Sequence, residues 1–275
     1  MKWTEEAECA VSRAPFFVRK RIRRRVEEEA LRLGAGEVRM EHVEACHQRM
    51  LNQMDDEIRG YRVETCFGFN GCPNSAFADP DLLDEIERQL ADRELKAFLK
   101  ARVGGPLKWH HEFRVSISAC PNACSQPQIV DVGLIGARRP RIGPASCTGC
   151  GACAAICREQ AILIPEDPAL PPVIDKQRCV ACGQCLNACP TGALEEDARG
   201  FRVLLGGKLG RHPQLGKELP GIFAPRDFLL ILKKSLNLYL QHNTCGERFG
   251  EILHRTGIDV LTETISHQEK SPQLI

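Results

Sequence analysis

The sequence lacks any apolar stretch of the roughly 18 residues that a membrane-spanning helix needs, so it predicts no transmembrane segment. It also lacks an excess of charge of either sign, because a formal net charge of +1 gives no global attraction to nucleic acid or to an acidic membrane. No export signal is recognisable, since acidic Glu27–Glu29 follow the basic run Arg19–Arg25 where an apolar segment would be required. We therefore expect a cytoplasmic chain with reduced cysteines and with neither a nucleic-acid nor a membrane partner.

A glycine-rich dinucleotide fingerprint in a strand–turn–helix context is missing as well, which argues against direct oxidation of NAD(P)H. What the chain has in abundance is cysteine. Its 275 residues contain 15 cysteines, most of them in short runs rather than dispersed as in a small disulfide-stabilised protein. The cysteine pattern therefore predicts metal binding.

Four of these cysteines form two separated pairs, Cys66-x5-Cys72 and Cys120-x3-Cys124. This spacing differs from that of a zinc ribbon, in which both pairs are usually C-x2-C. Two pairs on separate loops of one core can hold a single iron–sulfur cube between them.

Eight further cysteines form a C-x2-C-x2-C-x3-C run that occurs twice. The first run is Cys147, Cys150, Cys153 and Cys157, and the second run is Cys179, Cys182, Cys185 and Cys189. The offset between them is constant, and the local text repeats too, which indicates an internal duplication. Zinc binding by these eight cysteines is the alternative interpretation.

The duplicated runs resemble the bacterial two-cluster ferredoxin, in which the fourth cysteine of each run ligates the cluster of the other. The resemblance implies that Cys147, Cys150, Cys153 and Cys189 hold one [4Fe-4S] cluster. It implies that Cys179, Cys182, Cys185 and Cys157 hold a second one.

The two cysteine pairs, together with the segments 131–136 (DVGLIG) and 206–211 (GGKLGR), resemble the siroheme-dependent sulfite and nitrite reductase family. The resemblance is greatest to the small, anaerobic and dissimilatory types, which carry an inserted ferredoxin domain. It implies a siroheme bridged to a third [4Fe-4S] cluster, with Cys124 matching the bridging cysteine. The stretch from Trp3 to Val43 is similar to the small helical domain that ends one subunit of light-independent protochlorophyllide reductase.

These resemblances and the residue patterns predict an α+β fold built from a siroheme/[4Fe-4S] reductase core. We expect a helical domain at 1–59, the first part of the core at 60–140 and a ferredoxin insert at 141–199. The second part of the core and C-terminal helices are expected at 200–275. Within the core, the pattern predicts one helix from Pro80 to about Val103, and strands at Phe113–Ile117, Ile129–Ile135 and Phe201–Leu205.

Siroheme carries several carboxylates, so its pocket must supply cations. The basic residues near the family motifs are the candidates for that role: Arg114, Arg138, Arg139, Lys208 and Arg211. A bound oxyanion also needs positive charge and protons. The candidates for this catalytic role are Arg62, Lys108, His110 and His111.

The resulting interpretation is an enzyme that reduces sulfite to sulfide, with electrons arriving from a ferredoxin-like donor or a partner subunit through the two insert clusters. Nitrite reduction by the same centre, or a non-catalytic siroheme and iron–sulfur electron-transfer subunit, are the alternatives. The large assimilatory enzymes have a second copy of the core, which this chain lacks. Either another protomer completes the pocket, which predicts a homo-oligomer, or the anion site is degraded.

Overall fold

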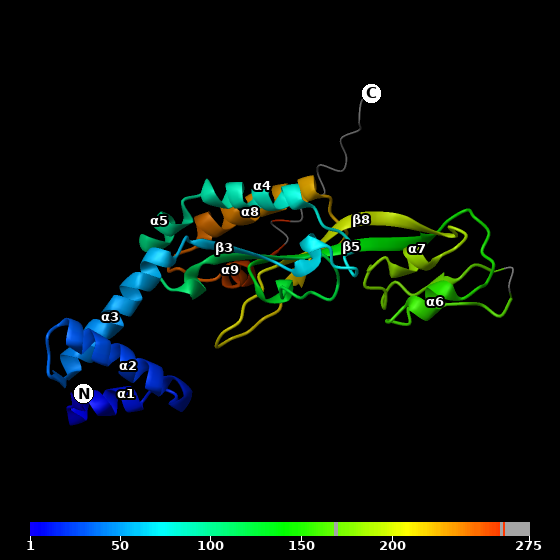
Figure 1. The fold of residues 1–275 in the computed structure, drawn as a ribbon. Helices are drawn as coiled ribbons and strands as arrows, with labels where there is room; N and C mark the ends of the chain where they lie inside the picture. Colours follow the sequence, from blue (N-terminus) through cyan, green and yellow to red (C-terminus); the bar gives the residue numbers. More distant parts are fainter. Residues whose placement is uncertain (168–169, 259–260, 262–275) are drawn as a thin grey trace.

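The computed structural model describes residues 1–167, 170–258 and 261, and Figure 1 shows an elongated chain with a helical part at one end and a cysteine-rich lobe at the other. The helices are α1 (Glu5–Ser12), α2 (Phe16–Arg32), α3 (Met40–Glu57), α4 (Pro80–Ala91), α5 (Leu95–Lys100), α6 (Ala152–Ile156), α7 (Gln184–Ala188), α8 (Pro225–His242) and α9 (Phe249–Thr256). The strands are β1 (Lys2–Trp3), β2 (Glu37–Val38), β3 (Tyr61–Thr65), β4 (Phe113–Ser118), β5 (Val132–Ile142), β6 (Ile162–Leu163), β7 (Val173–Ile174), β8 (Leu194–Leu205) and β9 (Lys217–Glu218). Short 3-10 helices occupy Phe67–Asn70, Trp109–His111 and Pro127–Ile129. No helix in these described ranges is long and apolar enough to cross a membrane.

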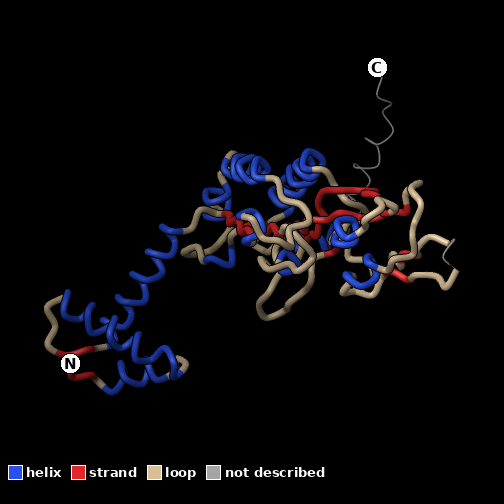
Figure 2. Tube along the Cα trace, turned by 45° about the vertical axis from the view of Figure 1, so that its right-hand side comes forward, coloured by secondary structure: helices blue, strands red, loops and turns tan. Residues whose placement is uncertain are grey.

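The N-terminal part packs α1, α2 and α3 around a small apolar core, beside the parallel pair β1–β2. Pro15 occupies the N-cap of α2, where its fixed φ and missing N–H cost nothing. The carboxylate of Glu29 is buried and bonds Arg32 at 2.6 Å and Arg49 at 2.8 Å, which ties α2 to α3. Helix α3 continues beyond this packing and connects the helical part to the rest of the molecule (Figure 2).

The central sheet has the order β3-β4-β5-β8-β9. Strands β3, β4 and β5 run parallel, and β8 is antiparallel to both β5 and β9. Alternating side chains of β4, namely Phe113, Val115 and Ile117, are fully buried in the main hydrophobic core together with residues of α4 and α8. Figure 1 shows these two helices side by side over one face of the sheet, and the structure is the expected α+β fold.

Several details differ from the sequence expectations: besides the longer strands β5 and β8, a helix, a strand start and one whole strand differ. The helix expected to run on from Pro80 breaks at Glu94, which has a φ of 46° and separates α4 from α5. No glycine marks this break, so the sequence did not signal it. The strand expected from Ile129 begins at Val132, because Pro127–Ile129 forms a 3-10 turn. Strand β3 was not assigned from the sequence at all.

The hairpin of β5 and β8 extends beyond the sheet, with pairing that continues to Ile142 and Leu194. This projecting hairpin, which we call the stem, carries the lobe formed by the residues between its two strands. In the lobe, Gly151 and Gly183 adopt left-handed φ values of 74° and 72° immediately before α6 and α7. The duplicated sequence therefore forms a duplicated structure. Of the second part of the core and the C-terminal helices expected at 200–275, residues 259–260 and 262–275 lie outside the described residues.

Candidate functional site

The two cysteine pairs of the core lie at the same edge of the sheet. Strands β3 and β4 are parallel and in register at Thr65 and Ile117, so both chains leave the sheet at its carboxyl edge. Cys66 follows β3 directly, and its sulfur accepts hydrogen bonds from the N–H groups of Gly68 and Ala119, each at 3.2 Å. The loop that carries Cys120 therefore touches the sulfur of the first pair.

The four thiols form one electrostatic group. Burial raises the pKa of Cys120, and the neighbouring charges of Cys66, Cys124 and Cys72 raise it further. Within the described residues, no three His, Cys, Asp or Glu side chains are close enough to bind a single metal ion. A zinc ion would need its thiolates at about 2.3 Å from one centre, whereas a four-iron cube takes each thiolate on a different iron. The all-thiolate donor set and its spacing fit the cube.

Two glycines of the DVGLIG segment let the second cysteine loop lie directly on β5. A side chain at Gly133 would collide with the carbonyl of Pro127, and one at Gly136 would collide with the carbonyls of Ala119 and Phe77. The same loop is tied to β4, because the carbonyl of Ser125 accepts a hydrogen bond from Ser116 Oγ at 2.6 Å. The glycine pattern that carried the family resemblance thus has a packing cause.

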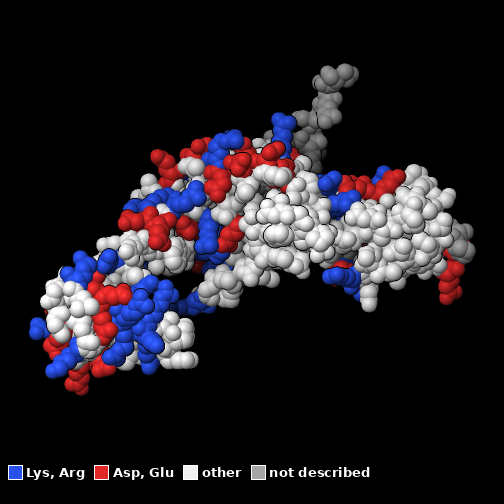
Figure 3. All heavy atoms as spheres, in the orientation of Figure 1, with Lys and Arg blue, Asp and Glu red and all other residues white. Residues whose placement is uncertain are grey.

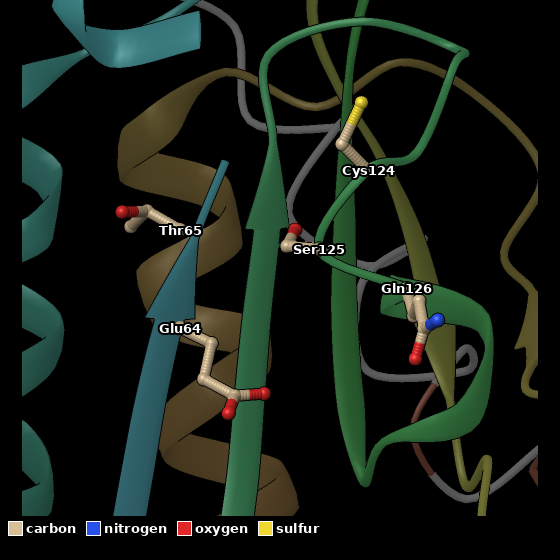
Figure 4. A pocket seen from close by; sticks show the side chains of 5 residues that line it. All are labelled: Glu64, Thr65, Cys124, Ser125 and Gln126. Carbon is tan, nitrogen blue, oxygen red and sulfur yellow. The ribbon is translucent and has the colours of Figure 1, made fainter. Parts of the chain in front are cut away.

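Cys124 is the exposed member of the group and opens onto a cavity of about 400 Å³. The cavity is lined by Glu64, Thr65, Cys124, Ser125 and Gln126 (Figure 4). Asn122 Nδ2 donates to the Cys124 sulfur at 2.9 Å. Ala123 and Gln126 on either side adopt positive φ values of 53° and 56°, a strained backbone that occurs preferentially at functional sites.

Two of the expected basic residues pair with one carboxylate that lines this cavity. Arg62 Nε and Arg114 Nη2 each lie 2.9 Å from an oxygen of Glu64, which lines the cavity. The Nε atom of Arg114 is buried and has no hydrogen-bond partner within the described residues. A buried guanidinium N–H without an acceptor is costly, so Arg114 keeps an unused donor beside its ion pair with Glu64.

Lys108, His110 and His111 are not brought to this cavity. They precede β4, whose six residues span about 20 Å before Cys120 is reached. The Lys108 backbone N–H donates to His111 Nδ1 at 3.0 Å, and the two imidazole rings contact each other. Burial lowers the pKa of His111 to about 4, with the charges of His110 and Lys108 contributing, and burial likewise lowers the pKa of His110.

The remaining basic candidates have other partners or positions. Lys208 is 8% exposed and its Nζ bonds Glu251 of α9 at 2.8 Å, while Arg211 is exposed in the following loop. Arg138 pairs with Glu196 at 2.5 Å and Arg139 pairs with Asp197 at 2.6 Å, both across the stem. The carboxylates of β8 therefore neutralise the two arginines.

The eight lobe cysteines separate into two quartets that exchange their fourth members. Cys147, Cys150, Cys153 and Cys189 line a single cavity. In the other quartet, burial raises the pKa of Cys185 to about 12, and the charges of Cys182, Cys179 and Cys157 add to the effect. We call the first group the outer quartet and the second group the inner quartet.

The inner quartet lies beside the core cysteines. The last pairing of β4 with β5 joins Ser118 to Ile135, two residues before Cys120. Further along the same edge of β5, the Arg138 N–H donates to the carbonyl of Ala181 at 2.7 Å and Arg138 forms a bridge with Cys182. Three residues of a strand span about 10 Å, so β5 holds the two cysteine loops next to each other.

Several site residues were missed from the sequence. Glu64 was overlooked because β3 was not recognised, although polar residues alternate along it. Asn122, Ser125 and Gln126 flank Cys124 in the chain and could have been identified by that proximity alone. Asp131 belongs to the segment 131–136 that carried the family resemblance, but nothing else in the sequence marked its carboxylate as a buried hydrogen-bond acceptor at the start of β5.

Comparison with known proteins finds two family models that match different parts of the chain. Residues 61–273 match the family model described as "Nitrite and sulphite reductase 4Fe-4S domain", and residues 3–46 match "Proto-chlorophyllide reductase 57 kD subunit". Both resemblances seen in the sequence are thereby confirmed.

Among curated proteins, the coenzyme F420-dependent sulfite reductase of Methanocaldococcus jannaschii is 30% identical over 162 residues, covering 58% of this chain and 26% of the relative. One subunit of the anaerobic sulfite reductase of Salmonella typhimurium is 35% identical over 52 residues, which are 19% of this chain and 15% of that relative. The chain thus spans about a quarter of the first relative's length. A crystal structure of dissimilatory sulfite reductase I matches with a TM-score of 0.50 at 18% identity, covering 83% of this chain and 60% of the other, which shows a shared fold.

Proposed function

This chain belongs to the nitrite and sulfite reductase family of iron–sulfur oxidoreductases, and from that premise we propose that it reduces sulfite to sulfide at a siroheme coupled to a [4Fe-4S] cluster. The observation that carries the proposal is the cavity beside Cys124, where an exposed cluster-type thiol lies near Glu64, a carboxylate that pairs with both Arg62 and Arg114. The sulfite reductase relatives in Methanocaldococcus jannaschii and Salmonella typhimurium favour sulfite over nitrite as the substrate.

In this proposal Cys66, Cys72, Cys120 and Cys124 would hold the core cluster, and Cys124 would be the ligand next to the siroheme. Arg114 is the side chain best placed to bind a siroheme carboxylate. When bound, these cofactors would supply one-electron transfer to the anion. Reduction of sulfite to hydrosulfide consumes six electrons and seven protons and releases three water molecules, so the protein must also provide a route for protons.

Arg62 is the proposed anion-binding cation. Its guanidinium is half exposed and shares Glu64 with Arg114, so it can turn toward a ligand in the cavity while Glu64 limits the local excess of positive charge. His110 and His111 are not assigned proton transfer, because β4 separates them from the cavity and their lowered pKa values keep both imidazoles neutral near pH 7.

The lobe provides the electron path. The outer quartet and the inner quartet would hold one [4Fe-4S] cluster each, and the inner quartet adjoins the core cysteines along β5. We therefore propose that electrons from a ferredoxin-like donor pass from the lobe clusters through the inner quartet to the core cluster.

The cavity beside Cys124 is open, whereas a site that reduces an anion at a bound macrocycle must exclude water. We propose that a second copy of the chain, or a different protein chain, closes it, which makes the active form a homo-oligomer or a hetero-oligomer. Such closure would also strengthen the attraction between Arg62 and a bound anion, because excluding water lowers the local dielectric constant.

The experiment is metal analysis and absorption spectroscopy of the anaerobically purified full chain, followed by turnover assays with reduced methyl viologen. We expect about twelve cluster irons and one siroheme iron per chain, a Soret-like band, and faster reduction of sulfite than of nitrite. Zinc in place of iron, or about eight irons without that band, would overturn the cofactor assignment. Faster reduction of nitrite would overturn only the substrate.

A further inference from the structure

We propose that the groove between the stem and the lobe is the docking site for the protein that donates electrons, a one-electron iron–sulfur carrier with an acidic face. The inference rests on the proposed electron path, to which it adds the surface where electrons enter and the kind of protein that delivers them. The groove encloses about 640 Å³. Its walls come from the stem, the lobe, the sheet strands β8 and β9 and the loop after β9: Arg139, Pro140, Arg141, Ile142, Pro172, Val173, Ile174, Lys176, Cys179, Ala181, Asp197, Arg202, Glu218, Gly221 and Ile222. We call it the stem groove.

The stem groove adjoins both lobe quartets. Cys179 of the inner quartet forms part of its wall. Pro172 lines both this groove and the cavity of the outer quartet, so the two hollows are adjacent. A carrier seated here would lose one electron to a lobe cluster, with no bond made or broken and no proton transferred. A ligand cysteine in the wall of a large open groove is the feature that identifies the occupant as a redox protein.

An uncovered apolar ridge borders the stem groove. Val173 of β7 lines the groove and is 57% exposed, and its cross-strand neighbour Leu163 of β6 is 64% exposed. The other faces of the same strands are covered, because Ile162 and Ile174 pack inside the lobe. Exposed apolar side chains beside a groove are characteristic of interaction surfaces, and a small patch suits the limited area of transient electron-transfer complexes.

The charges of the stem groove favour an acidic partner. Four basic side chains line it against two acidic ones. Both acids are already paired, Asp197 with Arg139 at 2.6 Å and Glu218 with Arg202 at 2.6 Å. Arg141 pairs with Glu195 of the stem, which leaves exposed Lys176 as the cation most available to a partner.

The other conspicuous surface lies on the helical part. Phe16 and Phe17 are 81% and 73% exposed at the start of α2, near a concentration of basic side chains that Figure 3 shows over this end. This end lies opposite the lobe in Figures 1 and 2, so a carrier bound there would be remote from the lobe quartets. Electron entry therefore favours the stem groove.

The test uses Val173→Glu and Lys176→Glu in the full holoprotein, with a two-cluster bacterial ferredoxin as the probe. Both side chains are exposed, so neither change disturbs the core. Each variant adds negative charge to the site, and we expect at least about tenfold weaker ferredoxin binding, measured anaerobically on a biosensor surface, with a steeper loss at low salt. The matched control is Leu31→Glu on α2, which is 65% exposed and should bind ferredoxin as the unchanged protein does.

Turnover with reduced methyl viologen distinguishes this inference from the proposed function. Because a small dye needs no docking surface, both groove variants should keep their dye-driven rate while losing ferredoxin-driven rate. If no anion is reduced even with the dye, the proposed function fails, but ferredoxin binding still tests the groove. Unchanged binding in both variants, equal weakening in Leu31→Glu, or no saturable binding to the unchanged protein would overturn the docking proposal.

Discussion

Replacing Asp131 should destabilise the core more than any exposed ion-pair deletion. Asp131 is 1% exposed at the start of β5. Its carboxylate accepts from the backbone N–H of Arg114 at 2.8 Å, from Arg248 at 2.6 and 3.1 Å, and from the N–H of Phe249 at 3.2 Å. One side chain thus ties β4, β5 and the start of α9 together.

The magnitude follows from what Asp131→Ala leaves behind. Arg248 is also largely buried, with 17% of its side chain exposed, so its charge would remain without a counterion. Removing one partner of a buried pair costs about 3–5 kcal/mol. For a core of this size each kcal/mol corresponds to roughly 2–4 °C, so the melting temperature should fall by about 6–20 °C. Asp131→Asn preserves the shape and one acceptor and should fall between Asp131→Ala and the unchanged protein.

The assay is thermal unfolding followed by far-ultraviolet circular dichroism, at one scan rate and equal cluster occupancy. Glu28→Ala is the control, because its pairing with Arg24 joins two exposed side chains of one helix. Such pairs contribute only about 0.2–0.5 kcal/mol. A shift for Asp131→Ala no larger than that of Glu28→Ala would refute the reasoning.

Three further outcomes are expected. Cys124→Ser should change the siroheme absorption as well as the cluster signal, whereas Cys150→Ser should leave the siroheme band intact and slow electron delivery; identical spectra for both would contradict the division of roles. Arg62→Gln should raise the KM for sulfite at least about tenfold through loss of an anion-binding charge, while Lys108→Gln should leave it unchanged, and steady-state kinetics would show the reverse if the anion site lay before β4. Hydrogen bonds from two arginines lower the pKa of Glu29 to about 2. The stability that ionised Glu29 adds to the folded protein is therefore complete above the ordinary glutamate pKa of about 4.3 and is lost as pH falls toward 2. Glu29→Gln should flatten the acid side of the plot of melting temperature against pH, and an unchanged slope would count against this assignment.

The sequence by itself identified the family and the metal-binding character of the chain. Cysteine spacing is local information, because C-x2-C and C-x3-C runs place thiols on one loop whatever surrounds them. Glycines at 133 and 136 also signalled the core, since only a residue without a side chain allows the cysteine loop to lie against β5. The alternation of Phe113, Val115 and Ile117 predicted β4 for a similarly local reason.

The tertiary structure decided which charged residues can act at the site. Arg138 and Arg139 looked equivalent to Arg114 in the sequence, but β8 brings Glu196 and Asp197 against them from 58 residues away. Lys108 and His111 looked close to Cys120, but an extended strand puts neighbours in sequence at opposite ends of a sheet. The position of the inner quartet next to the core cysteines likewise depends on tertiary pairing. Beyond the end of β4, the carbonyl of Ala181 accepts a hydrogen bond from Arg138 on the same edge of β5. These outcomes depend on strand register and on pairing between distant segments, and neither is encoded in the spacing of a local motif.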